Sequence, residues 1–184
     1  MGFRIKIENV VASATLGVKI KLEKLVANMD GIEYEPEQFP GLVLRLKEPK
    51  AAALVFSSGK IVCTGAKSPG DAKLVIAKIV QKVNKLGFHV PPHYKVKLEN
   101  IVASAKLEGE LNLDQIAFTL ENTEYEPEQF PGLVYRMDDP KVTFLLFGSG
   151  KIICTGGRSI SDVRKAVARL DKRLRALSRK KRSK

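Results

Sequence analysis

Apolar and polar residues alternate in several short stretches of the chain, and this spacing predicts β-strands. The predicted strands cover residues 3–14, 42–47, 51–56 and 60–64, and later 94–105, 143–147 and 151–155. Between them, apolar residues at helical spacing predict two short amphipathic helices. Their expected buried stripes are Leu22, Leu25, Val26 and Met29, ended by Gly31, and Leu113, Ile116, Ala117 and Leu120, preceded by Asn112 as the N-cap.

Two longer helices are predicted from the same helical spacing. The first begins at an N-cap Ser68 followed by Pro69, and it ends at Gly87. The second begins at Ser159 or Ser161. Their buried stripes are Ala72, Val75, Ile76, Ile79, Val80, Val83 and Leu86 in the first, and Val163, Val167, Leu170, Leu174 and Leu177 in the second.

The elements repeat at an offset of 91 residues. The segment 34–43 recurs letter for letter at 125–134, and 59–65 recurs at 150–156 with one Val/Ile change. Two copies are too few for a solenoid. They predict an α+β fold of two β-α-β-β-β-β-α repeats with pseudo-two-fold symmetry, in which an antiparallel sheet carries the helices on one face. The expected boundaries are 1–91, 92–177 and a basic tail at 178–184, with the Pro91-Pro92 pair at the joint.

Both sides of the predicted sheet carry apolar residues, which an antiparallel sheet with one solvated face does not require. If Ala53, Val55, Ile61 and Cys63 face the helices, then Leu54, Phe56, Val62 and Thr64 face outward. A large exposed apolar surface of this kind marks a binding site.

The net charge of +12 indicates a polyanionic partner, although the charge is unevenly spread. Residues 1–91 sum to +6, residues 92–163 to −4 and residues 164–184 to +10. Two isolated cysteines favour a cytoplasmic protein (nucleoid-associated, or nuclear in a eukaryote), and no apolar run is long enough to span a membrane. Neither the histidines nor the paired glutamates form a catalytic or metal-binding motif, so we expect no enzyme activity and no cofactor.

The expected outer face has the chemistry of a surface for a widened minor groove. Lys60, Lys151, Arg45 and Arg136 lie near strand ends and would form a cationic rim for phosphates. Its few polar groups, Asn9, Thr64, Asn100 and Thr155, can donate to the acceptors of A·T pairs, whereas the apolar residues leave no room for the guanine amino group. Phe39, Phe56, Phe130 and Phe147 recur at matched turns and strand ends, where they would act as wedges between base steps.

At these motifs the chain resembles the TATA-box-binding protein family, in the short archaeal form that consists of the conserved core. The resemblance covers about residues 4–177 and rests on Glu8–Ala12, Glu37–Gly41 and Ser58–Gly65, each with its second copy. It implies a saddle with a continuous curved antiparallel sheet, helices on the convex face, and binding and bending of TATA-box DNA. Proteins of this family are a familiar example of minor-groove wedging.

The resemblance also implies residue roles beyond those given above. The apolar floor would consist of Val11, Leu54, Val62, Val102, Leu145 and Ile153, and Ser58 and Ser149 would join the rim in holding phosphates. Transcription factor B would dock on the second-copy turn at Glu126 and Glu128, and would bring in RNA polymerase indirectly. The basic segment 178–184 lies outside the motifs, and Gly148 stands where the first copy has Ser57.

The residues leave two other functions open. The apolar face could dock a protein or a second copy of the chain, as in a homodimer without DNA, but such an interface does not need Asn and Thr in matched pairs. Single-stranded or RNA binding would require open aromatic platforms, and only 7% of the residues are aromatic. The four phenylalanines could also be core residues, and Cys63 and Cys154 are expected to be small buried residues.

Overall fold

The computed structural model describes the backbone of residues 4–182 and the side chains up to Arg179. The chain divides into two compact units. The first-repeat unit is Asn9–Glu99, and the second-repeat unit consists of the described residues up to Glu8 and from Asn100 onward. Strands β1 (Lys6–Thr15) and β6 (Val96–Lys106) therefore each contribute residues to both units.

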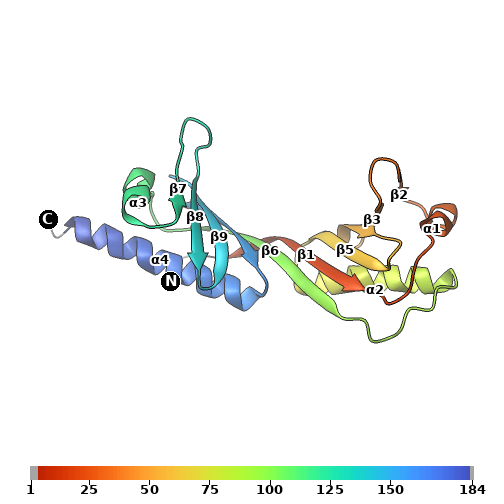
Figure 1. Ribbon diagram of the computed structural model, residues 1–184. Helices are drawn as coiled ribbons and strands as arrows, with labels where there is room; N and C mark the ends of the chain where they lie inside the picture. The colour runs from red at the N-terminus through yellow and green to blue at the C-terminus, as the bar shows by residue number, and fades with distance from the viewer. Residues whose placement is uncertain (1–3, 183–184) are drawn as a thin grey trace. The chain divides into compact units, whose positions relative to one another are not determined.

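The first-repeat unit has one face of its sheet covered by helix (Figure 1). Its strands lie in the order β2-β3-β4-β5-β1, and every pairing in it is antiparallel. Beyond β1, its elements are α1 (Leu22–Asn28), β2 (Ile32–Glu33), β3 (Leu42–Lys47), β4 (Lys50–Val55), β5 (Lys60–Ala66) and α2 (Pro69–Lys85).

The second-repeat unit has the same plan, with the antiparallel strand order β6-β10-β9-β8-β7. Its further elements are α3 (Leu113–Thr119), β7 (Thr123–Glu124), β8 (Leu133–Asp138), β9 (Lys141–Leu146), β10 (Lys151–Gly157) and α4 (Ile160–Arg182). The predicted α+β fold of two β-α-β-β-β-β-α repeats is confirmed. The described part of the 178–184 segment continues α4 up to Arg182.

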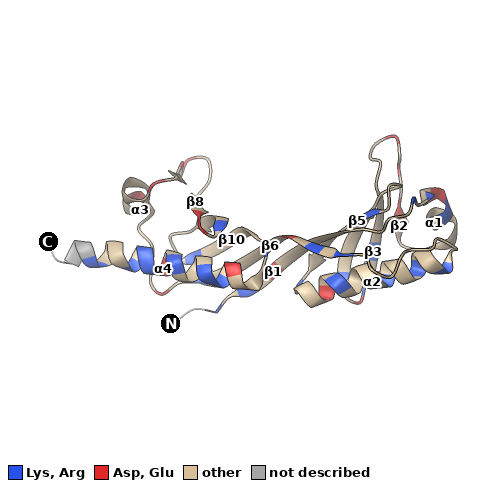
Figure 2. Cartoon of the chain, turned by 60° about the horizontal axis from the view of Figure 1, so that its bottom comes forward, with Lys and Arg blue, Asp and Glu red and all other residues tan. Residues whose placement is uncertain are grey.

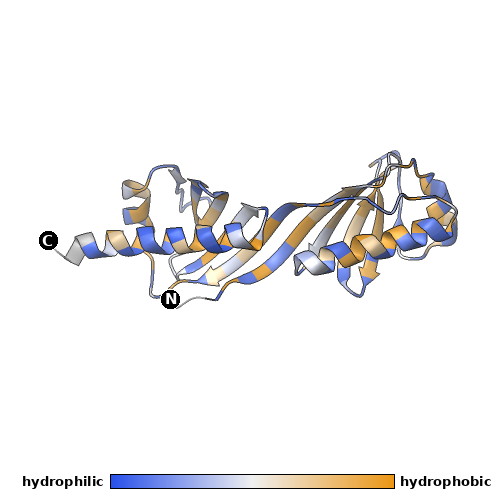
Figure 3. Cartoon of the chain, turned by 90° about the horizontal axis from the view of Figure 1, so that it is seen from below, coloured by the Kyte–Doolittle hydropathy of each residue, from blue (hydrophilic) through white to orange (hydrophobic). Residues whose placement is uncertain are grey.

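Each sheet buries alternate residues under its long helix. Ala53, Val55, Ile61 and Cys63 are fully buried, whereas Leu54, Val62 and Thr64 are half-buried, as alternation predicts. The second-repeat unit buries Phe144, Leu146, Ile152 and Cys154 in the same way. Apolar positions recur along these strands and along the helices (Figure 3). The core of each unit therefore lies between one sheet face and α2 or α4.

Polar caps fix where three of the helices begin. The hydroxyl of Ser68 accepts a hydrogen bond from the Asp71 N–H at 3.0 Å, and Ser159 caps α4 in the same way at Asp162. The Asn112 side chain accepts from the Gln115 N–H at 3.1 Å and caps α3. These contacts confirm Ser68 and Asn112, and they decide for Ser159 over Ser161 as the start of α4.

Helix α1 differs from its predicted form. It ends at Asn28, so Met29 lies beyond its last turn, and Val26 is 46% exposed instead of buried. Gly31 lies beyond the end of the helix and so does not terminate it. It adopts a φ of 73°, and its carbonyl accepts a hydrogen bond from the Arg45 N–H. Within α1 only Leu22 and Leu25 are buried, because a helix of seven residues can direct only a few side chains toward the core.

No described helix is long and apolar enough to cross a membrane. No group of three or more His, Cys, Asp or Glu side chains among the residues that the structure describes is placed to hold a metal ion.

Candidate nucleic-acid interface

The sheet face opposite the helices, here called the outer face, is apolar in both units. Cross-strand pairing aligns Val43, Leu54, Val62 and Ser13 in one row, and Val134, Leu145, Ile153 and Ser104 in the matching row. Val11 and Val102 lie on the same faces and are half-buried. The structure thus brings together the predicted floor residues of each unit.

The rows contain residues that the sequence analysis missed. Val43 and Val134 belong to the repeated segment, but which face they occupy follows only from their partners Leu54 and Leu145. Ser13 and Ser104 complete the rows, and their hydroxyls donate to Glu99 and Glu8 at 2.7 Å. Ser13 and Ser104 occupy matching positions in the two repeats, four residues after Asn9 and Asn100. This even spacing places them on the same strand face as the asparagines, and it could have identified them from the sequence.

A bulge beside β1 fixes the predicted Asn–Thr group of the first-repeat unit. The register shifts between Val10 and Ala12, and Gly65 in the facing strand adopts a φ of 95°, which favours glycine. The Gly65 N–H donates to the Asn9 amide oxygen at 2.7 Å, and the Asn9 amide nitrogen donates to the Thr64 hydroxyl at 3.3 Å.

The second-repeat unit reproduces this arrangement. The Gly156 N–H donates to the Asn100 amide oxygen at 2.6 Å, and the Asn100 amide nitrogen donates to Thr155 at 3.3 Å. Because a backbone N–H requires the amide oxygen, the orientation of both amides is determined. The second amide N–H and the threonine O–H can then donate outward, so each unit presents a pair of donors on an apolar face.

The four predicted wedges form two aromatic pairs. The Phe39 and Phe56 rings meet edge to face at 5.9 Å, and the Phe130 and Phe147 rings do so at 6.0 Å. Phe39 and Phe130 are each 43% exposed, which excludes the core alternative for these two.

A glycine that the sequence analysis did not single out packs under each aromatic pair. A Cβ on Gly41 would lie 2.7 Å from Phe39 and 2.9 Å from Phe56, and one on Gly132 would meet Phe130 at 2.8 Å. The rings therefore occupy the space that a side chain at either position would need.

The predicted rim is exposed, although not all of it is free. Lys60 and Lys151 are exposed after the turns that contain Ser58 and Ser149, and each serine hydroxyl accepts from the backbone N–H of its lysine. Arg45 donates to Glu33 at 2.7 Å, and Arg136 donates to Glu124 at 2.9 Å. Both predicted phosphate-binding arginines thus have a carboxylate partner on the adjacent edge strand.

The predicted partner-binding residues Glu126 and Glu128 are exposed in the loop between β7 and β8. The N–H groups of Gln129 and Phe130 both donate to the Glu126 carbonyl, so the backbone folds back on itself and carries both acidic side chains on the outside. Figure 2 shows acidic positions along this loop and on α3, and basic positions recurring along α4.

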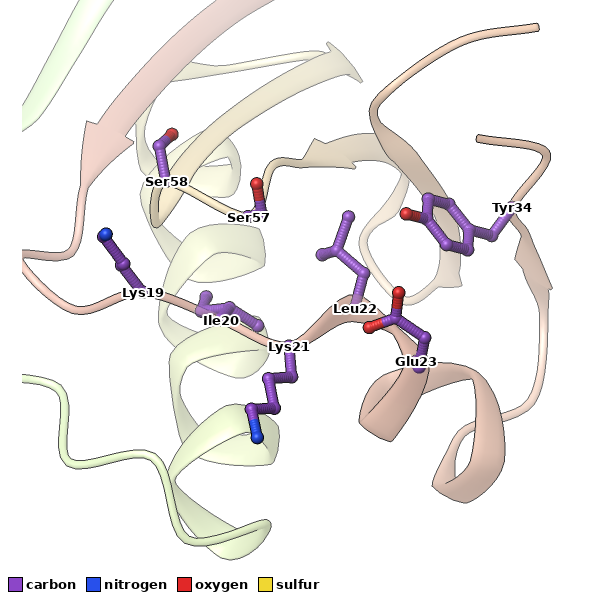
Figure 4. A pocket seen from close by; sticks show the side chains of 8 residues that line it. All are labelled: Lys19, Ile20, Lys21, Leu22, Glu23, Tyr34, Ser57 and Ser58. Atoms are coloured by element: carbon purple, nitrogen blue, oxygen red, sulfur yellow. The ribbon is translucent and has the colours of Figure 1, made fainter. Parts of the chain in front are cut away.

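Hollows in the described part of the first-repeat unit lie beside predicted rim and donor residues, and no floor residue lines the two described next. One, shown in Figure 4, has the predicted rim residue Ser58 in its wall, together with Lys19, Ile20, Lys21, Leu22, Glu23, Tyr34 and Ser57. The other adjoins Thr64 at the β3–β4 turn and has the basic lining residues Arg45, Lys47, Lys50 and Lys67. At the positions of Lys47 and Glu48 the second repeat has Asp138 and Asp139, so the two turns differ in charge.

The cysteines are the small buried residues that the sequence predicts. Both are free and nearly inaccessible, and burial raises the pKa of Cys63 from 9.0 to about 11 and that of Cys154 to about 12. A thiol held protonated is a poor nucleophile and a poor metal ligand.

Comparisons with known proteins agree with this geometry. The family model described as transcription factor TFIID (or TATA-binding protein, TBP) matches the chain twice, at residues 4–86 and 95–177. The TATA-box-binding protein of Archaeoglobus fulgidus is 57% identical over 95% of this chain and 97% of its own length, and that of Methanobrevibacter smithii is 56% identical over 94% and 96%. The solved structure of Methanococcus jannaschii TBP, 50% identical, superposes with a TM-score of 0.88 over 94% of this chain and 99% of its own. With two matched repeats and relatives of this identity over nearly its whole length, the chain belongs to the TATA-box-binding protein family of general transcription factors, which is not a family of enzymes.

Proposed function

We propose that the outer faces bind A·T-rich promoter DNA in the minor groove and that the phenylalanine pairs bend it. The observation that carries this proposal is the donor pair of each unit, Asn9 with Thr64 and Asn100 with Thr155. The minor-groove edge of an A·T pair has only acceptors, whereas G·C adds the guanine amino donor. A face of fixed donors between apolar side chains is complementary to A·T and repels G·C.

The test uses three duplexes of equal length that separate the grooves. Inosine lacks the guanine amino group, so an I·C duplex resembles A·T in the minor groove and G·C in the major groove. We expect gel-shift affinities for A·T and I·C duplexes within a few-fold of each other, and at least tenfold weaker binding to G·C. Equal rejection of I·C and G·C would refute minor-groove recognition.

Bending is proposed to come from the exposed rings, which would enter between base steps at the cost of unstacking. Phe130→Ala with Phe147→Ala should reduce energy transfer between dyes on the duplex ends and shorten the lifetime of the complex. The matched control is Phe118→Ala, which removes an exposed ring from α3 and not from the outer face. An unchanged bend with intact affinity would show that these rings are not wedges.

The complex is further proposed to recruit transcription factor B through Glu126 and Glu128, and RNA polymerase through that factor. Both side chains are exposed in one loop of the second-repeat unit, where a basic protein surface can reach them. Glu126→Arg with Glu128→Arg should weaken capture of the purified factor by the DNA complex at least tenfold. Unchanged capture would exclude this loop as the docking site.

A further inference from the structure

The most exposed large apolar side chain in the described part of the chain is Phe118, on α3. It is 93% exposed, whereas the other exposed large apolar residues there lie between 43% and 46%. Helix α3 packs through Leu113 and Ile116, so Phe118 contributes nothing to the core of its unit. Burying this ring against a partner would contribute free energy that its exposed position in the monomer does not use.

The first repeat shows that the fold does not need this ring. At the offset of 91 residues the position of Phe118 is occupied by Ala27, which is exposed on the equivalent helix α1. Alanine also has the higher helix propensity, so Phe118 is not favoured by helix stability either. The ring is thus specific to the second repeat.

The charged residues around the two helices also differ between the repeats. Lys19, Lys21 and Lys24 surround α1, and the matching positions around α3 are Glu110, Asn112 and Gln115. Asp114 lies one helical turn before Phe118 and Glu121 follows the helix; both are exposed, and the first repeat has the acidic residues Glu23 and Asp30 at these positions. Phe118 is therefore flanked by acidic residues and lacks the lysines that accompany the first-repeat helix, an arrangement complementary to a basic protein surface with an apolar recess.

This surface is structurally tied to the loop that carries Glu126 and Glu128. The Thr123 hydroxyl, at the start of β7, lies 3.3 Å from the carbonyl oxygens of both Ala117 and Leu120. Strand β7 then pairs with β8 through Glu124 and Val134, on the two sides of the loop. In Figure 1, α3 stands next to β7.

We propose that α3 is a second docking element for the basic partner, and that Phe118 inserts into an apolar recess of that partner. The inference rests on the proposed function, since it extends the partner surface from the β7–β8 loop onto α3. Buried aromatic anchors dominate binding at many protein interfaces, while the surrounding charges contribute orientation and association rate. The loop then supplies charge, and Phe118 supplies most of the apolar contact.

The experiment measures binding of purified transcription factor B to the protein on saturating A·T-rich duplex. Phe118→Ala is expected to weaken this binding about tenfold or more, chiefly through faster dissociation. DNA affinity and thermal stability should not change, because the side chain is exposed. The matched control Val26→Ala, on α1, should leave partner binding unchanged.

The outcomes separate the inference from the function on which it rests. Full partner binding by Phe118→Ala, together with a loss in Glu126→Arg with Glu128→Arg, would overturn the α3 site and leave recruitment intact. Full binding by both variants would overturn recruitment as well. If Phe118→Ala instead dissociates a dimer of the free protein in sedimentation experiments and leaves partner binding unchanged, the ring is covered by a second copy, and the proposal is wrong.

Discussion

In Asn9 and Asn100 the amide oxygen and the amide nitrogen have different roles. The oxygen accepts a backbone N–H at a bulge, and the nitrogen is left to donate to threonine and outward. Aspartate could keep the first contact but not the second, since an ionised carboxylate only accepts. The chemistry of the outward group can therefore be changed without removing the side chain from the bulge.

We predict that Asn100→Asp weakens binding to an A·T-rich duplex by at least tenfold, because it replaces a donor by a charged acceptor facing acceptors and phosphates. The measurement is a fluorescence titration at fixed salt. The control is Asn112→Asp, which makes the same chemical change at the N-cap of α3, where the side chain only accepts and Asp serves as well. Equal losses in both variants would mean that the effect is on folding and not on base contact.

The buried thiols give the unfolding free energy a defined pH dependence. Their pKa values are raised from 9.0 to about 11 in Cys63 and about 12 in Cys154, so between these limits the folded state holds protons that the unfolded state has lost. Their stabilising contribution is complete below pH 9 and is lost as pH rises, by about 1.4 kcal/mol per pH unit and thiol.

We predict that denaturant unfolding between pH 9 and pH 10 shows a steeper fall of the unfolding free energy in the parent chain than in Cys63→Ala with Cys154→Ala. The alanines leave cavities, so the variant is less stable at every pH and only the two slopes are compared. Parallel slopes would show that the thiols ionise alike in both states.

At the scale of elements, the short edge strands β2 and β7 hold the rim arginines. Glu33 and Glu124 each come from an edge strand and pair with an arginine of the neighbouring strand. Both pairs are largely exposed, so their own contribution to stability is small. We expect a larger effect on DNA affinity, because in the proposed complex a carboxylate beside a guanidinium competes with phosphate for it.

We predict that Glu33→Gln with Glu124→Gln raises DNA affinity about two- to fivefold per repeat at low salt, an estimate from the strength of exposed ion pairs. The gain should shrink as salt is added. Asp171→Asn, which breaks the Asp171–Arg175 pair on α4, is the control and should change affinity little. A loss of affinity in the glutamine variant would mean that the carboxylates position the arginines for binding.

At the scale of the whole molecule, the two repeats share their outer faces and differ elsewhere. The donor pairs are identical and the floor residues nearly so, with Ile153 in place of Val62, while residues 1–91 carry +6 and residues 92–163 carry −4. Matching floors give little reason to prefer one orientation on a near-palindromic A·T site. The acidic surface of the second repeat, including Glu126, Glu128, Asp138 and Asp139, instead favours a basic partner that also contacts the adjacent DNA.

We predict that the chain alone binds such a site in both orientations and that the partner selects one. A cleavage reagent attached to Gln38→Cys or Gln129→Cys, in the two matched exposed loops, reports the orientation, and the buried native thiols should not take up the reagent. Cuts should be nearly symmetrical without transcription factor B and one-sided with it. The β3–β4 and β8–β9 turns differ in charge, and any preference for one orientation that these exposed turns give the chain alone should vanish when salt is added. Strongly one-sided cutting by the chain alone at moderate salt would contradict this.

The sequence by itself determined the order of elements, the repeat and the face that residues 53–55 and 61–64 present, but not the faces beyond the bulge at Gly65. These features follow from local periodicity, because alternation in a strand and capping by Ser68 or Asn112 act within a few residues. It did not determine how far α1 extends or that Val26 is exposed, since neither depends on spacing alone.

Only the tertiary structure decided the features that join distant residues. The register of β3 with β4 put Val43 in the floor, and the bulge at Gly65 turned the amide of Asn9 outward. The pairing of Arg45 with Glu33 and the exposure of the Phe118 ring also depend on the tertiary structure. The physical reason is that these properties depend on which residues meet across strands and on what remains uncovered, and both are set by packing between segments far apart in the chain.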